Sequence, residues 1–333
     1  MAEQPFHPPP ASGAVTPDFF LCDIATALPK DDMASMEHPV FSLSTRPDRR
    51  VLDYAHGTTR IKITPSVKGL ATIHDKDILI YCISQLVAAL NAGRDVSKRL
   101  ELVAHDLLKS TRRETGGDSY RRLVEAFERL AGTRITTNIV TGDVETTTGF
   151  GLIESWQVTR RTRSGRMVSV SVTLSDWLYR AILSRSVLSL SPDYFALRKP
   201  LERRVYEIAR KHCGRQASWR VSMTVLHRKS GSASPLRVFR KMIRDMEAAA
   251  ALPDYELSVA PGDLVLVRPR MDVIEADGPT LPPEAMDAAR AAAPGLDIYA
   301  LEADWRRYWA ASGKPRLRSP AKAFVAYCAK RAS

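Results

Sequence analysis

Apolar residues follow a helical spacing in the stretch after Asp75. The positions concerned are Ile78, Cys82, Leu86 and Leu90. Side chains four residues apart share one face of a helix, so the pattern predicts a helix that runs to Asn91 with one buried face. Asp75 can cap the start of this helix, and Gly93 supplies its stop.

A second helix is predicted after a short strand and a brief helical stretch. The apolar run from Leu100 to Val103 favours a strand, and the residues up to Lys109 favour a short helix. Asp118 and Ser119 follow a polar turn and can cap a helix of about Tyr120 to Ala131. Its apolar face consists of Leu123, Phe127 and Leu130.

The next segments indicate β-structure and a hairpin. A β-rich stretch opens at Arg134, and Val168 to Leu174 alternates strictly between apolar and polar residues. Trp156 and Val158 lie on the other side of a Ser164-Gly165 turn, which predicts a β-hairpin. The order helix, short strand, short helix, capped helix and hairpin is typical of a winged helix, whose capped helix enters a groove of DNA.

The same order of elements recurs in the second half of the chain. A helix is predicted from Leu201 and a short strand at Trp219 to Val221. Ser234 as N-cap, with Pro235 at the first helical position, predicts the start of another helix. The apolar stripe of that helix is Phe239, Met242, Ile243 and Met246. The second hairpin is predicted from two alternating segments, Tyr255 to Val259 and Leu264 to Arg268.

These patterns predict an α+β fold of tandem winged-helix domains with an N-terminal extended arm and a small C-terminal helical segment. The expected parts are the arm (1–57), the first domain (58–185), the second domain (186–270), a linker (271–283) and the C-terminal segment (284–333). The arm is rich in proline and is expected to be partly disordered. Phe19 and Phe20 are either anchors packed onto the body or a motif that docks a partner.

The amino-acid composition indicates that the protein binds a polyanionic partner. The 333 residues include 49 lysines and arginines against 37 acidic residues, so the formal net charge is +12. This excess goes well beyond what solubility requires. No apolar run approaches the roughly 20 residues that cross a bilayer, and we expect a cytoplasmic protein without membrane contact. The four scattered cysteines fit a reducing compartment.

Motifs for catalysis or metal binding are missing from the sequence. It contains no Gly-x4-Gly-Lys-Ser/Thr phosphate loop, no His-x-His and no His-Glu-x-x-His. Asp75 and Asp77 are better explained by helix capping than as metal ligands of a nuclease. We therefore expect no enzymatic activity, no cofactor and no metal ion.

Positive charge gathers on the last predicted helix of the second half. The cations are Arg237, Arg240, Lys241 and Arg244. Their spacing places them on one face, beside the apolar stripe, and acidic residues begin only at Asp245. Arginine can bind guanine O6 and N7 in the major groove, so the pattern favours DNA contact. A solvated face without a ligand is the alternative.

In the first half, candidate DNA contacts lie at the start of the capped helix and at the hairpin tip. The helix positions are Ser119, Tyr120, Arg121 and Arg122, and the hairpin positions are Arg160, Arg161, Arg163 and Arg166. Pairing with Glu125 and Glu128 could occupy part of the helix charge. The hairpin tip has no acidic residue and is suited to phosphates.

The C-terminal segment combines aromatic and basic residues. Residues 313–333 contain six cations and no acid, interleaved with Phe324 and Tyr327. They indicate either a further nucleic-acid contact or a helix that docks a protein. Trp305 and Trp309 are expected to serve as packing or protein-contact anchors, because single-strand binders usually present aromatic side chains from sheets.

Six motifs occur in order along residues 30 to 270. They are DDMASMEHPVFSLS (31–44), PSVKGLATIHDKDILIY (65–81), AHDLL (104–108), GGDSY (116–120), LAGTRI (130–135) and GFGLI (149–153). Together they resemble the plasmid replication initiator protein A family.

The resemblance implies a bacterial initiator that binds repeated double-stranded DNA sites at the origin of a plasmid or mobile element. Such a protein helps to open the duplex and recruits host replication proteins, such as the replicative helicase or its loader. The resemblance also implies self-association into a homodimer and no catalytic site. It carries DNA contact onto residues 116–135, 160–166 and 234–244. The alternative is a winged-helix transcriptional repressor, and a nuclease or primase ranks third.

Overall fold

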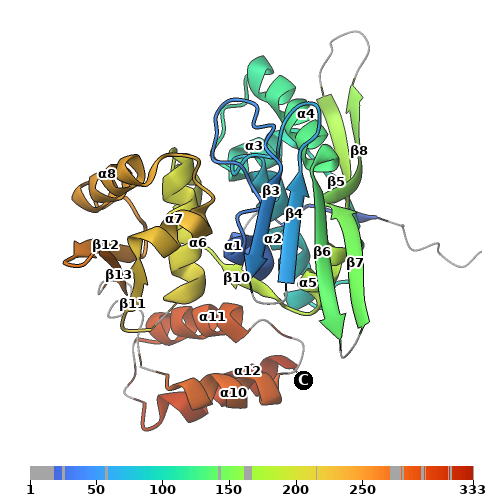
Figure 1. Cartoon of the computed structure of the whole chain (residues 1–333). Coiled ribbons are helices and arrows are strands. Elements are labelled where there is room, and N and C mark those ends of the chain that lie inside the picture. The colour runs from blue at the N-terminus through green and yellow to red at the C-terminus, as the bar shows by residue number, and fades with distance from the viewer. Residues whose placement is uncertain are drawn as a thin grey trace, which may run out of the picture.

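The computed structural model describes residues 19–24, 27–56, 59–141, 144–160, 167–214, 216–270 and most of 279–332, and these form a mixed α+β fold (Figure 1). Its buried apolar residues form three clusters. The core of the first body consists of residues between Phe20 and Val187. The core of the second body consists of residues between Leu190 and Val267 together with Met36 and Ile80. The third core belongs to the C-terminal bundle and lies between Ala289 and Cys328.

The first body contains the predicted order of elements. These are α2 (Lys76–Asn91), β5 (Arg99–Leu102), α3 (Ala104–Ser110), α4 (Gly117–Gly132), β8 (Ile153–Arg160) and β9 (Met167–Leu174). Strand β5 pairs with β9, and β9 pairs with β8, both antiparallel. Helix α2 has 13 of its 16 residues buried, so it is a central helix rather than one with a single buried face.

A second sheet belongs to the same body. Its strands are β3 (Leu52–His56), β4 (Thr59–Thr64), β6 (Arg134–Thr141) and β7 (Val144–Gly151), in the order β3-β4-β6-β7. Local sequence predicted the β-rich stretch from Arg134. It did not show that β4 and β6 pair across some seventy residues of chain, because local pattern carries no information about pairing between strands so far apart in sequence.

The described part of the predicted arm packs on the body. Strand β1 (Phe20–Leu21) lies parallel to β5, and β2 (Lys30–Asp32) pairs with β10 (Val187–Ser189). Phe20 is 4% exposed and belongs to the first core, whereas Phe19 is 40% exposed. Phe20 is therefore an anchor of the kind considered from the sequence. Three short elements complete this region, namely α1 (Met33–Glu37), α5 (Asp176–Leu183) and a 3-10 turn at Tyr194–Ala196.

The second body repeats the strand pairing of the first. It consists of α6 (Pro200–His212), β11 (Trp219–Ser222), α7 (Met223–Ser230), α8 (Leu236–Ala248), β12 (Tyr255–Ala260) and β13 (Leu264–Pro269). The sheet order is β11-β13-β12, which matches the order β5-β9-β8. The Ser222 hydroxyl accepts a hydrogen bond from the Val225 amide and caps α7.

Two helix starts differ from the prediction by one to three residues. Helix α4 begins at Gly117 with Gly116 as N-cap, because Asp118 turns its carboxylate to two arginines instead of the helix amides. Helix α8 begins at Leu236, and Pro235 is its N-cap with ψ of 145°, so Ser234 lies one residue further out. Asp75 precedes α2 without a capping bond to the helix, since its carboxylate accepts from Arg129.

Three helices form the C-terminal bundle at the end of the molecule opposite α4 and α8 (Figure 1). They are α10 (Pro283–Ala292), α11 (Ile298–Ala311) and α12 (Pro320–Ala332). Trp305 is 3% exposed and lies 5.4 Å from the ring of Phe324, so it is a packing anchor as expected. Most of the predicted linker lies outside the described residues. None of the helices in the described part of the chain is long and apolar enough to cross a membrane.

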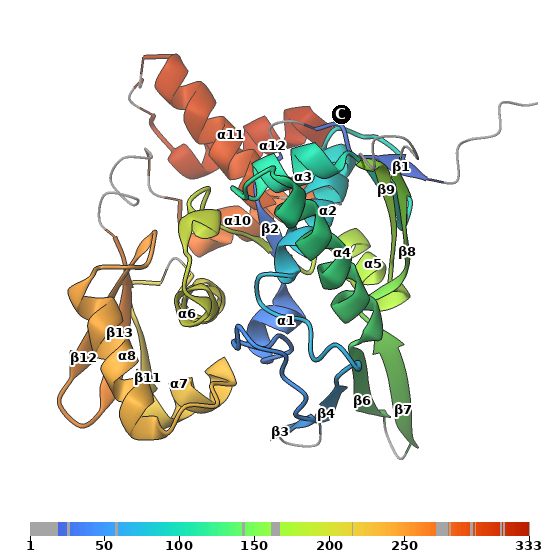
Figure 2. The ribbon, with the colours of Figure 1, turned by 90° about the horizontal axis from the view of Figure 1, so that it is seen from above.

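A buried ionic network joins the two bodies where α6 lies beside the first body (Figure 2). The Lys76 ammonium lies 2.5 Å from Asp31 and 3.1 Å from Glu207, and none of these side chains is more than 1% exposed. Arg203 on α6 pairs with Asp77 on α2. Burial raises the pKa of Asp31 well above its usual range, whereas the two carboxylates raise the pKa of Lys76. These contacts hold α6 against α2.

A second ionic cluster, centred on Glu37, joins α1 to the second body. The Glu37 carboxylate pairs with Lys211 and Lys229, and the His212 ring lies 3.2 Å from it. Burial alone would raise its pKa, but the hydrogen bonds from Lys229 and Lys211 hold the pKa at about 2, below the ordinary value of 4.5. The stability that Glu37 contributes is therefore present above pH 4.5 and is lost as the pH falls toward 2.

We expect Glu37→Gln to lower the free energy of unfolding near pH 7 because it removes the charge from this cluster. The difference from wild type should shrink as the pH falls below 4.5, where Glu37 of the unfolded wild-type chain takes up its proton while Glu37 of the folded protein is still charged. Urea unfolding at several pH values measures this. Glu114→Gln is the matched control at an exposed position. A difference that stayed constant down to pH 3 would contradict the prediction.

Candidate nucleic-acid interface

Helix α8 presents a cationic face to solvent. Phe239, Ile243 and Met246 are buried against the sheet of the second body. Arg237 and Arg244 are exposed on the opposite side, and within the described residues neither makes an ion pair or a side-chain hydrogen bond. Since the apolar stripe fixes the helix on its sheet, these two cations remain available to a ligand.

The other two cations of this helix have carboxylate partners, which the sequence did not predict. Arg240 donates from Nε at 3.0 Å and from an Nη at 2.8 Å to Asp263, in the turn between β12 and β13. Hydrogen bonds from Arg240 lower the pKa of Asp263. Lys241 lies 3.0 Å from Asp245, but both side chains are more than half exposed, so the pair is weak.

The Arg240–Asp263 contact positions the arginine relative to the hairpin. Asp263 has a φ of 61°, and the preceding Gly262 has a φ of 80°, so the turn is a tight left-handed one. The Asp263 carbonyl also accepts a hydrogen bond from the Met223 amide at 2.8 Å. The turn is therefore tied to the start of α7, and Arg240 is held in a defined place between α8 and the hairpin.

The first-body helix candidates lie on the first two turns of α4. Arg121 and Arg122 are about 70% exposed and both pair with Asp118, not with Glu125 or Glu128 as expected. An i,i+3 or i,i+4 pair in solvent contributes little, so both guanidiniums can exchange this partner for phosphate. Ser119 is half-buried, and Tyr120 packs against the first core. Tyr120 therefore contributes to the packing of α4 on the first core and is not well placed to contact DNA.

The hairpin of β8 and β9 is attached directly to α4. Trp156 of β8 stacks on Phe127 of α4, with ring centroids 5.6 Å apart. Arg160 is exposed at the end of β8. Arg161, Arg163 and Arg166 lie outside the described residues. The stacking fixes the direction of the hairpin relative to the α4 arginines.

The two helices lie in the upper half of the molecule, α8 on the side of the second body and α4 above the first (Figure 1). Viewed from above, α8 lies at the left and α4 to the right of the centre (Figure 2). Both helices thus lie away from the C-terminal bundle, which is at the opposite end of the molecule (Figure 1).

Residues 30–257 match the family model described as Replication initiator protein A. The chain belongs to the replication initiator protein A family. A protein of Wigglesworthia glossinidia brevipalpis named "Putative replication protein" is 38% identical over 244 residues, which are 72% of this chain and 88% of that protein. The family indicated by the sequence motifs is thus confirmed.

Two solved structures resemble this initiator-family protein. A crystal structure of RctB domains 2-3 aligns with a TM-score of 0.51 at 15% identity and covers 73% of this chain and 99% of that chain. A structure of SeMet derivatives of domain 2 and domain 3 of RctB gives a TM-score of 0.49 at 13% identity, over 68% of this chain and 92% of that chain. The first of these likenesses shows a related fold.

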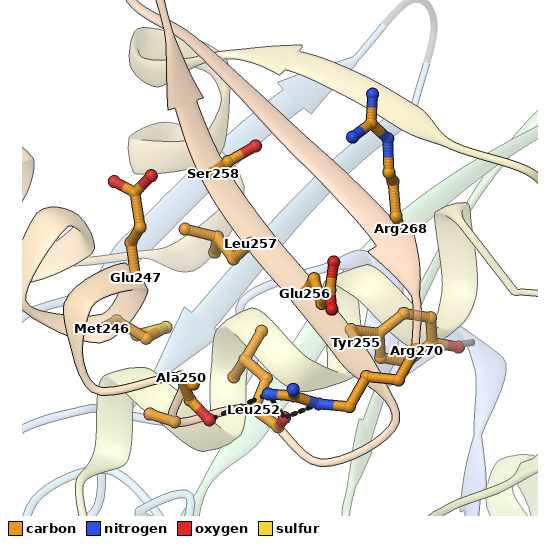
Figure 3. Close-up of a pocket in the computed structure, with 11 residues that line it drawn as sticks. Met246, Glu247, Ala250, Leu252, Tyr255, Glu256, Leu257, Ser258, Arg268 and Arg270 are labelled. Atoms are coloured by element: carbon orange, nitrogen blue, oxygen red, sulfur yellow. Dashed lines mark hydrogen bonds between the residues drawn. The ribbon is translucent and has the colours of Figure 1, made fainter. Parts of the chain in front are cut away.

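One pocket of this initiator-family protein lies at the far end of α8 (Figure 3). Its volume is about 300 Å³, and Met246, Leu252 and Leu257 supply its apolar lining. Arg270 donates to the carbonyls of Ala250 and Leu252. The guanidinium thus holds the connection between α8 and β12 in place.

Reactive groups are also scarce in the described part of the chain. No cluster of three or more metal-ligating side chains occurs there. All four cysteines are buried, and burial raises the pKa of Cys82 to about 12 and that of Cys328 to about 11. These thiols are therefore protonated and poor nucleophiles near neutral pH.

Proposed function

We propose that this protein initiates the replication of a plasmid or mobile element by binding repeated double-stranded DNA sites at its origin. The two bodies act as winged helices, in which α4 and α8 enter the major groove and the β8–β9 and β12–β13 hairpins contact the flanking backbone. The observation that carries this proposal is the repeated strand pairing, which in each body holds a helix with an exposed cationic start beside a hairpin.

Membership of the family supports the replicative role, and the net charge of +12 supports a nucleic-acid partner. Two tandem modules in one chain fit two successive contacts on the same duplex. Recruitment of host proteins such as the replicative helicase or its loader, and self-association into a homodimer, belong to the same proposal. The protein needs no cofactor and no catalytic group for these tasks.

Selection of bound duplexes from random DNA, followed by footprinting, tests the proposal. We expect a repeated sequence, protection in two adjacent stretches, and affinity that falls steeply with salt. A flat response to salt would contradict DNA binding through phosphate contacts. Incubation with Mg²⁺ and supercoiled plasmid should leave the plasmid uncut, since a nuclease would nick it.

A transcriptional repressor that uses the same DNA-facing residues is the alternative. Maintenance of a plasmid in a host that lacks any other initiator separates the two functions. We expect the plasmid to persist only when this protein is supplied. Binding to the selected sites without plasmid maintenance would favour the repressor.

We expect Arg240→Ala to weaken binding to a selected duplex by about 1–3 kcal/mol and to relax discrimination at one base pair. Asp263→Asn should relax discrimination at the same base pair, because Arg240 loses the carboxylate that holds it, whereas Asn tolerates the positive φ. Binding curves with single-base variants of the duplex measure both effects. Equal loss on every sequence would indicate that Arg240 contacts a phosphate.

A further inference from the structure

Two apolar side chains lie on the exposed face of α8. Val238 and Met242 are each 39% exposed. They are four residues apart and therefore adjacent on one strip of the helix. The sequence pattern assigned Met242 to the buried stripe, but only Phe239, Ile243 and Met246 of that stripe are buried. Neither Val238 nor Met242 is among the residues that form or pack against the second core.

This apolar strip runs beside the cationic strip. Successive residues are about 100° apart around a helix. Val238 is therefore about 100° from Arg237, and Met242 is about 100° from Lys241 in the same direction. The exposed face of α8 thus has a charged side, formed by Arg237, Lys241 and Arg244, and an apolar side, and Asp245, the partner of Lys241, lies at their boundary. Arg240 lies at the other edge of the charged side and points to the hairpin turn.

The two strips complement different parts of a DNA duplex. Cationic side chains suit phosphates and guanine, whereas the C5-methyl of thymine is the apolar group that base edges display in the major groove. Two side chains are too small an area for a stable protein interface, which buries about 800 Å² on each partner. The flanking cations also favour an anionic ligand over an apolar protein surface.

We infer that Val238 and Met242 contact thymine C5-methyl groups in the major groove and thereby select T·A pairs at the positions they face. This inference rests on the proposed function, since it requires α8 to enter the groove. It assigns part of the sequence preference to packing of methyl groups instead of hydrogen bonds.

The test replaces single thymines of a selected duplex by deoxyuridine, which removes only the methyl group. Wild-type protein should bind about three- to tenfold more weakly at one or two of these positions, as expected when one buried methyl group is removed. Val238→Ala and Met242→Ala should bind the thymine duplex more weakly. Each variant should also lose its sensitivity to deoxyuridine at one position and keep it at the other.

Two control variants accompany this test. Arg237→Ala should weaken binding to the thymine and deoxyuridine duplexes by the same factor, because a cation does not sense the methyl group. Val67→Ala changes a valine that is 84% exposed in the turn before α2 and should bind both duplexes as wild type does. Circular dichroism and urea unfolding check that the α8 variants are folded.

The outcomes separate the inference from the proposed function. If wild-type protein selects no duplex from the random pool, the proposed function fails. If it selects a duplex and footprints on it, but both alanine variants keep the full deoxyuridine sensitivity of wild type, the function stands and the inference fails. Absence of any deoxyuridine effect in wild type would likewise overturn the inference alone.

Discussion

Replacement of Lys76 by methionine should destabilise the protein by about 3–5 kcal/mol, because it leaves the buried Asp31 without its cation and Glu207 with Arg204 alone. Asp31 and Glu207 are almost fully inaccessible to solvent and come from different bodies. Methionine has nearly the length of lysine, so the loss reports charge and not volume. Urea unfolding at pH 7 measures the effect, and the same substitution at exposed Lys62 is the control.

The pH dependence of this variant follows from Asp31. Its pKa in the folded protein lies above the unfolded value, so its contribution to stability is greatest at low pH and is lost as the pH rises through the folded pKa. Lys76 lowers the pKa of Asp31, and its removal raises that pKa further. We therefore expect the deficit of Lys76→Met to be largest near neutral pH and to shrink on acidification.

A combined variant distinguishes charge from packing. Lys76→Met together with Asp31→Asn and Glu207→Gln removes these three charges, and Arg204, the other cation at Glu207, keeps its hydrogen bonds to backbone carbonyls. The triple variant should recover part of the lost stability. If it is no more stable than Lys76→Met, the buried charges are not the cause of the loss.

Removal of both unpaired α8 arginines should have the largest effect on DNA binding. We expect Arg237→Ala/Arg244→Ala to bind a selected duplex about 10²–10³-fold more weakly, because each good arginine contact is worth about 1–3 kcal/mol. Neither side chain has a carboxylate partner to lose among the described residues, so the fold should be unaffected. Titrations at several salt concentrations measure the affinity.

The salt dependence tells which groups the two arginines contact. Removal of one arginine–phosphate interaction should reduce the slope of log affinity against log salt by about 0.9. A slope smaller by about two, with weaker binding to all sequences, would indicate that both arginines bind phosphates. An unchanged slope with relaxed sequence preference would indicate base contacts. Arg180→Ala, which changes an exposed arginine of α5, is the matched control, and an equal loss for it would contradict a specific role of α8.

Local pattern in the sequence was sufficient to place most of the elements around the candidate interface. The spacing of Leu123 and Phe127 predicted α4, the alternation at Val168 to Leu174 predicted β9, and Pro235 marked the start of α8 to within one residue. These patterns depend only on residues within one or two helical turns or along one strand. They can therefore be read from the sequence without knowledge of the fold. The family motifs also identified the chain's relatives.

Tertiary structure decided which charges are paired and which side chains remain exposed. Arg240 is 23 residues from Asp263, and Lys76 is 131 residues from Glu207. Such contacts arise only when separate elements pack, and periodicity along one helix carries no information about them. Met242 illustrates the same limit, since its helical spacing fits both the edge of a buried stripe and an exposed strip. Only the position of α8 on its sheet places Met242 in solvent, where it can meet a ligand.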